Sequence, residues 1–196
     1  KLVNIVSCFA FQGTNIYVGT LDSGIFYSTN KGESWSEINN GLTSLSVNKI
    51  IIKDNNIYAG TFIGGVSLST NNGESWSAVS SDLLKPVYKK NNIYCLALNG
   101  TKLFAGTSYG LYSTEDNGST WSACHSGLAS TNVVSLYKNG NNLFAGTNNG
   151  IFQSSNYGEN WECLNSDLDY SIEVRGIIKE NDKIFIGTNL KGVLMS

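Results

Sequence analysis

The stretch Ser69-Thr70-Asn71-Asn72-Gly73-Glu74-Ser75-Trp76 decides the fold, because the chain repeats it with little change. The same order of a hydroxyl residue, Asn or Asp, Gly and Trp recurs at 28–35, 114–121 and 154–161. The tryptophans that end the four copies stand 40 to 45 residues apart. A period of that length indicates a protein built by repeating one supersecondary unit.

A second phrase recurs in phase with the first. Tyr58-Ala59-Gly60-Thr61 precedes Trp76, and related phrases stand at 17–20, 104–107, 144–147 and 185–188. The fifth copy of this phrase is not followed by a tryptophan phrase. Five units are therefore predicted, and the last is expected to be incomplete.

Each unit is predicted to contain four short strands. In the second unit these strands are expected at 47–53, 57–61, 66–70 and 76–80. Asp54-Asn55-Asn56 is expected to form a tight turn between the first two strands, and Asn-Gly pairs stand at the same place in other units. Asn-Gly favours the positive φ angles that two-residue hairpins require. Short strands, frequent turns and no helical periodicity predict an all-β protein.

The strands are apolar on both faces, as the run Ile50-Ile51-Ile52 shows, whereas a half-exposed strand should alternate. Gly60 lies within a strand, where glycine often marks a close backbone approach. Sheets stacked around an axis would bury both faces. We therefore expect a β-propeller of five sequential four-stranded antiparallel blades, the last incomplete. It would form a single domain over 1–196, with blades at about 1–41, 42–83, 84–128, 129–168 and 169–196.

The tryptophan phrase resembles the Asp-box, or BNR, repeat of β-propellers, and the resemblance covers nearly the whole chain. It looks most like bacterial exported repeat proteins and the photosystem II assembly-factor type of propeller. The resemblance implies that the box is a structural turn between the third and fourth strands, remote from any active site. The residues that would form these turns are Asn30, Gly32, Trp35, Asn71, Gly73, Trp76, Asp116, Gly118, Trp121, Asn156, Gly158 and Trp161.

Only Asp116 keeps the aspartate of the Asp-box pattern. Asparagine can still accept hydrogen bonds from the turn backbone, so the structural role is expected to survive in the other copies. The four tryptophans are expected to wedge between neighbouring sheets.

The composition excludes several classes of function. Charged residues make up 14% of the chain and the net charge is −2, so a nucleic-acid partner is not expected. No apolar run approaches the roughly 18 residues that a membrane span needs. The sequence starts at Lys1 rather than Met, which agrees either with a removed leader or with a fragment of a longer protein. An exported protein, extracellular or periplasmic, is the expectation.

No catalytic set stands out, so no enzyme and no cofactor are predicted. A sialidase of Asp-box type clamps its substrate with three arginines, and this chain has only Arg175. The acidic residues that could form a glycosidase pair lie mostly in turns. His125 is the only histidine and is expected to be an exposed residue at a strand end. No metal site is predicted.

The four cysteines are predicted to be free thiols that behave as small buried hydrophobic residues. Cys8 and Cys95 occupy equivalent positions in units one and three, and Cys124 and Cys163 fall in fourth strands. First and fourth strands of one sheet are about 14 Å apart. A disulfide needs Cα atoms within about 7 Å.

Function is expected where the copies differ, in loops and in the links between units. The residues singled out for binding are Tyr88, Lys89, Tyr109, Tyr170 and Arg175, because tyrosine and arginine are enriched in binding hot spots. The leading hypothesis is a non-catalytic binding or scaffold module for protein interaction or for self-association through the open last blade. A glycan-binding, lectin-like propeller is the alternative, and a glycoside hydrolase is a third possibility.

Overall fold

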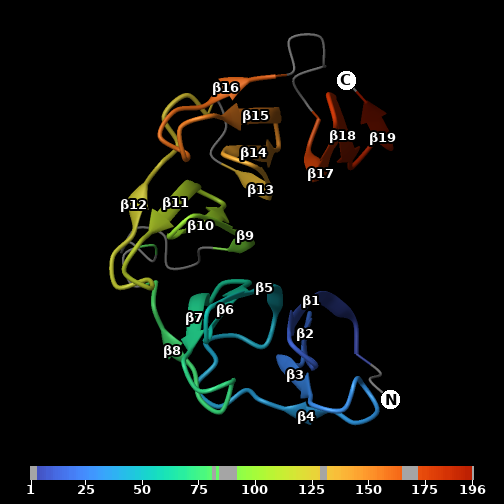
Figure 1. Cartoon of the computed structure of the whole chain (residues 1–196), viewed down its shortest axis with the longest axis vertical. Coiled ribbons are helices and arrows are strands. Elements are labelled where there is room, and N and C mark those ends of the chain that lie inside the picture. The colour runs from blue at the N-terminus through green and yellow to red at the C-terminus, as the bar shows by residue number, and fades with distance from the viewer. Residues whose placement is uncertain (1–3, 81–82, 84–91, 129–131, 165–171, 196) are drawn as a thin grey trace. The chain divides into compact units, whose positions relative to one another are not determined.

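The computed structural model describes residues 4–80, 83, 92–128, 132–164 and 172–195, and these residues form nineteen strands. The strands make five antiparallel sheets that follow one another along the chain, and within each sheet the strands lie in chain order (Figure 1). Four sheets have four strands and the fifth has three. The expected all-β class, with four-stranded sheets and a shorter last one, is confirmed.

The strand bounds repeat from sheet to sheet. The first sheet holds β1 (Val6–Gln12), β2 (Asn15–Thr20), β3 (Ile25–Ser28) and β4 (Ser36–Glu37). The second holds β5 (Val47–Lys53), β6 (Asn56–Thr61), β7 (Gly65–Ser69) and β8 (Ser77–Ala78). The third holds β9 (Ile93–Asn99), β10 (Lys102–Thr107), β11 (Gly110–Thr114) and β12 (Ser122–Ala123). The fourth holds β13 (Val133–Asn139), β14 (Asn142–Thr147), β15 (Gly150–Ser154) and β16 (Glu162–Cys163). The fifth holds β17 (Val174–Glu180), β18 (Lys183–Thr188) and β19 (Val193–Met195).

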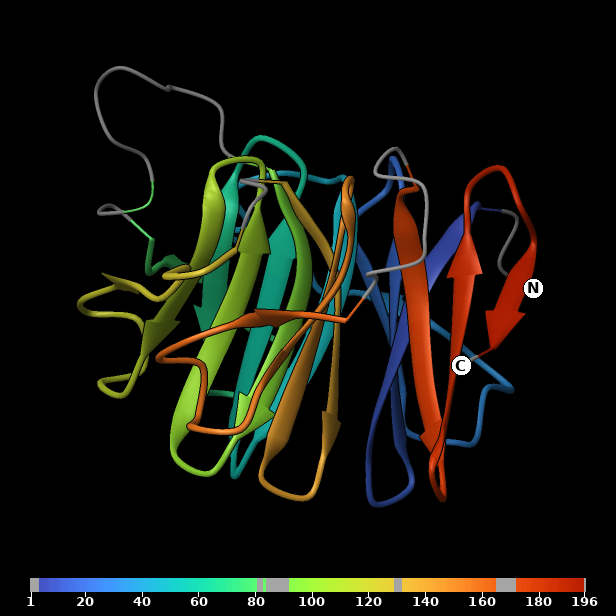
Figure 2. The same cartoon turned by 90° about the horizontal axis from the view of Figure 1, so that it is seen from above.

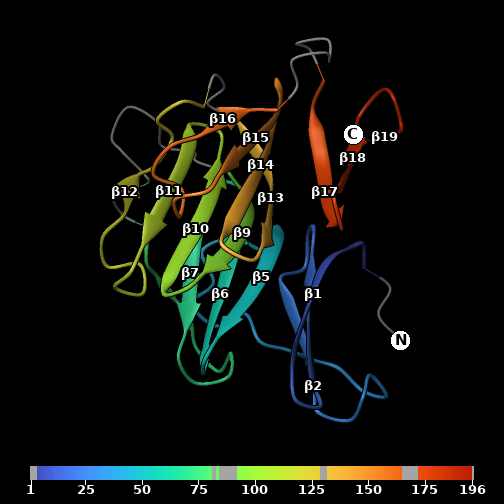
Figure 3. The same cartoon turned by 45° about the horizontal axis from the view of Figure 1, so that its top comes forward.

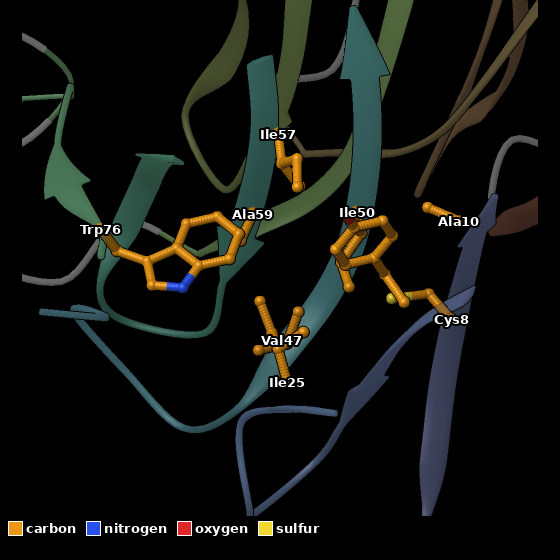
Figure 4. Packing of buried hydrophobic residues seen from close by; sticks show 9 residues of the cluster. Cys8, Ala10, Ile25, Val47, Ile50, Ile57, Ala59 and Trp76 are labelled. Carbon is orange, nitrogen blue, oxygen red and sulfur yellow. The ribbon is translucent and has the colours of Figure 1, made fainter. Parts of the chain in front are cut away.

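The chain divides into two compact units, one made of 1–96 with 116–120 and the other of 97–115 with 121–196. In the first unit β1 packs against β5. Figure 4 shows this core, in which Cys8 and Ala10 of β1 face Ile50 of β5, with Trp76 at its outer side. In the second unit β13 packs against β17 (Figure 3), and the core contains Phe144 and Val174.

Glycine in the second strand of a sheet permits this packing. A Cβ atom at Gly60 would lie 2.6 Å from Cγ2 of Ile93, the first residue of β9. A Cβ atom at Gly146 would lie 2.9 Å from Cγ1 of Val174, the first residue of β17. Both distances are too short for real atoms, so only glycine lets the next strand approach. The close approach predicted at Gly60 is confirmed.

The turn at 69–76 is closed by its own side chains. The Ser69 hydroxyl accepts a hydrogen bond from the Gly73 N–H at 2.8 Å, and Asn71 Oδ1 accepts one from the Ser75 N–H at 3.0 Å. Asn72 and Gly73 both have positive φ angles, of 59° and 92°. The turns at 28–35 and 154–161 use the same bonds with Asn30 and Asn156. Asparagine therefore performs the turn role that the sequence predicted for it.

The tryptophans connect one sheet to the preceding sheet. The indole N–H of Trp76 donates to the carbonyl of Ile38 at 2.6 Å, and that of Trp161 donates to the carbonyl of Cys124 at 2.9 Å. Trp121 is buried as well. Trp35 of the first sheet is only half-buried, so the expected wedge is wrong for this residue.

All four cysteines are free, as predicted, but they are not all buried. Cys8 and Cys95 are buried in first strands, whereas Cys124 is half-buried and Cys163 is exposed. Cys163 lies in β16, where both residues of the short fourth strand are exposed. The prediction of a buried thiol at Cys163 was wrong because β16 is the edge strand of its sheet, pairs with β15 over two residues only, and has both residues exposed.

Candidate functional site

The strongest candidate site lies on the loops at one end of the first two sheets. The segment 43–46 links these sheets and lies between the β2–β3 loop and the β6–β7 loop. The Gly24 N–H donates to the Leu45 carbonyl at 2.8 Å, and the Phe62 N–H donates to the Ser46 carbonyl at 2.8 Å. A Cβ atom at Gly64 would meet Thr43 and Ser44 within 2.9 Å. The link therefore holds both loops in contact through their backbones.

Four apolar side chains of this region are exposed to solvent, and we call them the loop surface. Its members are Leu21, Leu45, Phe62 and Ile63. Phe62 and Ile63 are 43% and 38% exposed. Leu45 belongs to the link and the Phe62 N–H bonds to it, whereas the Leu21 N–H donates to the Ile5 carbonyl at 3.0 Å. Exposed apolar side chains that gather in one region of a folded protein commonly mark a site of interaction.

Ile63 is held in a strained backbone conformation. Its φ angle is 71°, and a β-branched residue rarely adopts a positive φ. The Ile63 N–H donates to Asn92 Oδ1 at 3.1 Å, a bond from the segment before β9 that fixes the loop. Strain of this kind costs about 1–3 kcal/mol and tends to persist at binding sites. This strain supports a role for Ile63 beyond packing.

Polar groups border the loop surface. Asp22 accepts a hydrogen bond from the Ser23 hydroxyl at 2.9 Å, and the Asn4 side chain donates to the same hydroxyl at 2.6 Å. Thr20 Oγ1 accepts the Ser23 N–H at 3.0 Å. The border therefore presents one carboxylate beside an apolar centre.

The binding residues predicted from the sequence fall in different places. Tyr88, Lys89 and Tyr170 lie outside the described residues. Tyr109 lies in the β10–β11 loop of the third sheet, where its N–H donates to Thr107 Oγ1 at 3.0 Å. Arg175 lies in β17 of the fifth sheet and forms an exposed ion pair of 2.7 Å with Glu173. Tyr109 and Arg175 thus belong to different sheets.

The residues of the loop surface were not among the predicted binding residues. A signal was nevertheless present, because Leu21, Phe62 and Ile63 are apolar in loops where the fourth sheet has Asn148 and Asn149. The enrichment of tyrosine and arginine in hot spots favours those residues over aliphatic loop residues, and the backbone bonds of the link at 43–46 leave no local pattern in the sequence.

His125 is not the exposed residue that the sequence predicted. Its ring is half-buried, lies edge-on to Tyr112 at 5.9 Å, and places Nδ1 3.3 Å from the Leu111 carbonyl. A Cβ atom at Gly110 would lie 2.6 Å from the same ring. Because it fills space beside β11, His125 has a packing role.

Two further features bear on chemistry. Within the described ranges, no three side chains of His, Cys, Asp or Glu gather as metal ligands would. The described residues also contain no helix of the length and apolar character that would cross a bilayer.

The sheets, their order and their packing define the class of the chain as a β-propeller fold. The extracellular domain of a one-component system from B. thetaiotaomicron superposes over 100% of this chain with a TM-score of 0.78 and 21% identity. An ancestral GH74 enzyme superposes over 94% of this chain with a TM-score of 0.75 and 20% sequence identity. YCF48 bound to D1 peptide superposes over 97% of this chain with a TM-score of 0.68 and 19% sequence identity.

The chain spans only 28%, 27% and 63% of the lengths of these three structures. At sequence identities this low, the similarity to these structures shows the fold alone. No family model matches the sequence, and no curated protein matches it.

Proposed function

We propose that the chain is a non-catalytic module that binds an apolar segment of another protein through the loop surface. One observation carries this proposal: Leu21, Leu45, Phe62 and Ile63 are exposed on two loops and on the link that bonds to both of these loops. A rigid apolar centre with a polar border is the usual anatomy of a protein-binding site. Preorganised loops also lower the entropic cost of binding.

Two lines support a binding role. The similar structure of YCF48 was solved with a D1 peptide, so a protein of this fold can hold a peptide. The other similar structures include extracellular domains of sensor proteins from B. thetaiotaomicron. Together with the Asp-box character of the turns at Asn30, Asn71, Asp116 and Asn156, they support membership of the Asp-box propellers and export from the cell.

The absence of catalysis is part of the proposal and has its own test. GH74 enzymes are among the similar structures, so xyloglucan and aryl glycosides are the substrates to try. We expect no hydrolysis above the buffer control at high protein concentration. Turnover that disappears when Asp22 is replaced by Asn would contradict the proposal, because Asp22 is the carboxylate at the border of the loop surface.

Selection from a random peptide library displayed on phage tests the binding role. The immobilised 196-residue chain should enrich peptides rich in apolar residues. Their affinity should fall at least tenfold for Phe62→Asp, because the charge would have to be buried in the interface. Tyr157→Ser is the matched control, since Tyr157 is equally exposed but lies in the turn at 154–161. This variant should bind as the parent chain does.

Two results would contradict the proposal. One is a library that yields no peptide, and the other is a set of peptides that bind Phe62→Asp unchanged. A glycan array in which one sugar class binds the parent chain and fails to bind Phe62→Asp would assign the loop surface to glycans instead.

A further inference from the structure

Six Asn-Gly pairs in the chain each place an asparagine before a residue that lacks a side chain. The backbone nitrogen of the following residue can attack the side-chain amide carbon of asparagine. Glycine favours this attack because it has no Cβ atom to obstruct the approach, and asparagine is accordingly among the thermolabile residues of proteins. The six pairs begin at Asn40, Asn72, Asn99, Asn117, Asn139 and Asn149. Which pair reacts depends on how the fold holds it.

In the pairs that begin at Asn72 and Asn149, the glycine nitrogen is already engaged. The Gly73 N–H donates to the Ser69 hydroxyl at 2.8 Å, and the Gly150 N–H donates to the Ile172 carbonyl at 2.9 Å. Both glycines are buried. The nitrogen would have to give up a bond that closes its turn before it could attack, so the fold protects these two pairs.

In two further pairs, another segment of the chain holds the asparagine. The Tyr58 hydroxyl donates to Asn117 Oδ1 at 2.8 Å, which fixes the side-chain amide. The Asn40 carbonyl accepts a hydrogen bond from the Trp76 N–H at 2.9 Å. A Cβ atom at Gly41 would lie 2.3 Å from the Trp76 carbonyl oxygen, so the backbone after Asn40 is packed against the backbone of Trp76. These contacts oppose the rotation that would bring the nitrogen to the amide carbon.

The remaining two pairs occupy the same place in their sheets but differ in burial. Asn99 ends β9 and Asn139 ends β13, and each is followed by a two-residue turn; the gold hairpin in Figure 2 joins β13 to β14. Asn99 is only 3% exposed, so its amide is packed inside. Asn139 and Gly140 are both exposed, and nothing lies within 4 Å of a Cβ atom at Gly140. No residue of the described part of the chain accepts a hydrogen bond from the Gly140 N–H.

We propose that Asn139 is a site of spontaneous deamidation in the folded chain. The Gly140 nitrogen loses its proton and forms a bond to Cγ of Asn139, while the bond between Cγ and Nδ2 breaks. Nδ2 takes up a proton and leaves as ammonia. Water then adds to one of the two carbonyls of the five-membered imide and opens the ring. The product is aspartate or isoaspartate, and water is the only co-reactant.

The reaction changes both the charge and the backbone at the end of β13. It adds a carboxylate to a chain of net charge −2, directly after Lys138. In isoaspartate the main chain runs through the side chain and gains a carbon atom before Gly140. Asn139 and Asn142 form the last pair of the β13–β14 ladder, so isoaspartate should remove this pair and loosen the turn. The site shares no residue with the loop surface and goes beyond the proposed function.

Incubation of the folded 196-residue chain at mildly alkaline pH, followed by isoelectric focusing and peptide mass spectrometry, tests this proposal. Alkali speeds the reaction because the deprotonated nitrogen is the attacking group. One acidic form should accumulate, with at least about tenfold more product at Asn139 than at any other Asn-Gly pair. Isoaspartyl methyltransferase should label this form. The chain unfolded in guanidinium chloride is the reference, since all six pairs are then exposed and the preference for Asn139 should vanish.

Three variants provide matched controls. Asn139→Gln should stop formation of the acidic form, because glutamine would have to close a larger ring; Gln12 holds the same register position in β1, so the fold accepts it. Gly140→Asp should slow the reaction several-fold, and Asp54 already holds that turn position with a φ of 57°. Asn141→Gln changes an exposed asparagine of the same turn that precedes no glycine, and it should leave the reaction unchanged.

The proposal is overturned if the folded chain yields product first at another Asn-Gly pair, or if Asn139 reacts no faster than the other pairs do. A folded chain that keeps its amides while the unfolded chain loses them would equally exclude it, because the turn would then protect Asn139. Peptides selected on the loop surface should bind the deamidated chain as they bind the parent chain, so the two proposals stand or fall separately.

Discussion

Cys8 and Cys163 differ sharply in exposure. Cys8 packs in the core of the first unit, and Cys163 is exposed in β16. We expect Cys163 to react within seconds with a thiol reagent such as Ellman's reagent, and Cys8 to react only after unfolding. Loss of the fast phase in Cys163→Ser would verify the assignment. Rapid labelling of more than one thiol in the native Cys163→Ser variant would argue against the burial described, since only Cys124 then remains half-buried.

Buried acidic groups should make the fold sensitive to alkali. Burial raises the pKa of the Cys8 thiol above its usual value of 9.0, and it raises the pKa of Tyr17 to about 12. Between pH 9 and pH 12 the unfolded chain loses these protons and the folded chain keeps them. The free energy of unfolding therefore falls as the pH rises through this window, and these groups have no effect below it.

Urea unfolding at about pH 8 and about pH 10.5 measures this alkaline effect. The midpoint should be lower at the higher pH, and Tyr17→Phe should reduce the difference. A midpoint that rises with pH would contradict the expected sign.

Ile63 links stability to binding. Its left-handed conformation costs about 1 kcal/mol or more, and asparagine tolerates the same φ better. Ile63→Asn should therefore raise the free energy of unfolding by about 1 kcal/mol while it weakens peptide capture by the loop surface. Urea unfolding and peptide affinity measured on one preparation check both effects. If Ile63→Asn is less stable than the parent chain but binds the peptides with the same affinity, Ile63 has a packing role only.

Among the elements, the short fourth strands explain how neighbouring sheets are joined. The Trp76 backbone N–H donates to the Asn40 carbonyl at 2.9 Å and its indole N–H donates to the Ile38 carbonyl. Both N–H groups of Trp76 thus donate to carbonyls that follow the preceding sheet rather than to strands of their own sheet. For this reason β8 pairs with β7 over only two residues, where five had been predicted.

Trp76→Ala should cost about 3–5 kcal/mol of stability, the range for a buried large aromatic residue. Trp35→Ala should cost clearly less, because Trp35 is half-buried and has no hydrogen bond from its indole among the described residues. Chemical denaturation of the two variants side by side provides the comparison. Equal losses would show that the first sheet holds its tryptophan as firmly as the second does.

The first three strands of each sheet could be predicted from sequence, whereas for the loop surface the sequence shows only apolar residues at loop positions and not their arrangement. Val47–Lys53 was predicted to the residue because an apolar run ends at a turn with Asp54, whose φ is 57°. Turn residues and apolar runs are local signals, so one sequence suffices. The exposure of Leu45 and Phe62 depends instead on how the link at 43–46 crosses the ends of two sheets. Backbone contacts between distant segments leave no local pattern to read.

For the whole molecule, the repeat places stability in the contacts between successive sheets. In repeat proteins stability is approximately the sum of each unit and its interfaces with its neighbours. The glycine hollow is the recurring part of that interface, filled by Val47 over Gly19 and by Val174 over Gly146. These sheets stack by inserting a β-branched residue over a glycine.

The effect of Gly60→Val on urea unfolding, at a concentration where the chain is monomeric, tests this claim most directly. A Cβ at Gly60 meets Ile93, so the variant should lose about 1–3 kcal/mol through overpacking. Gly176→Val is the matched control, because nothing lies within 4 Å of a Cβ there, and its stability should change little. If Gly60→Val is as stable as the parent chain, the sheets do not pack through these glycines and the account is wrong.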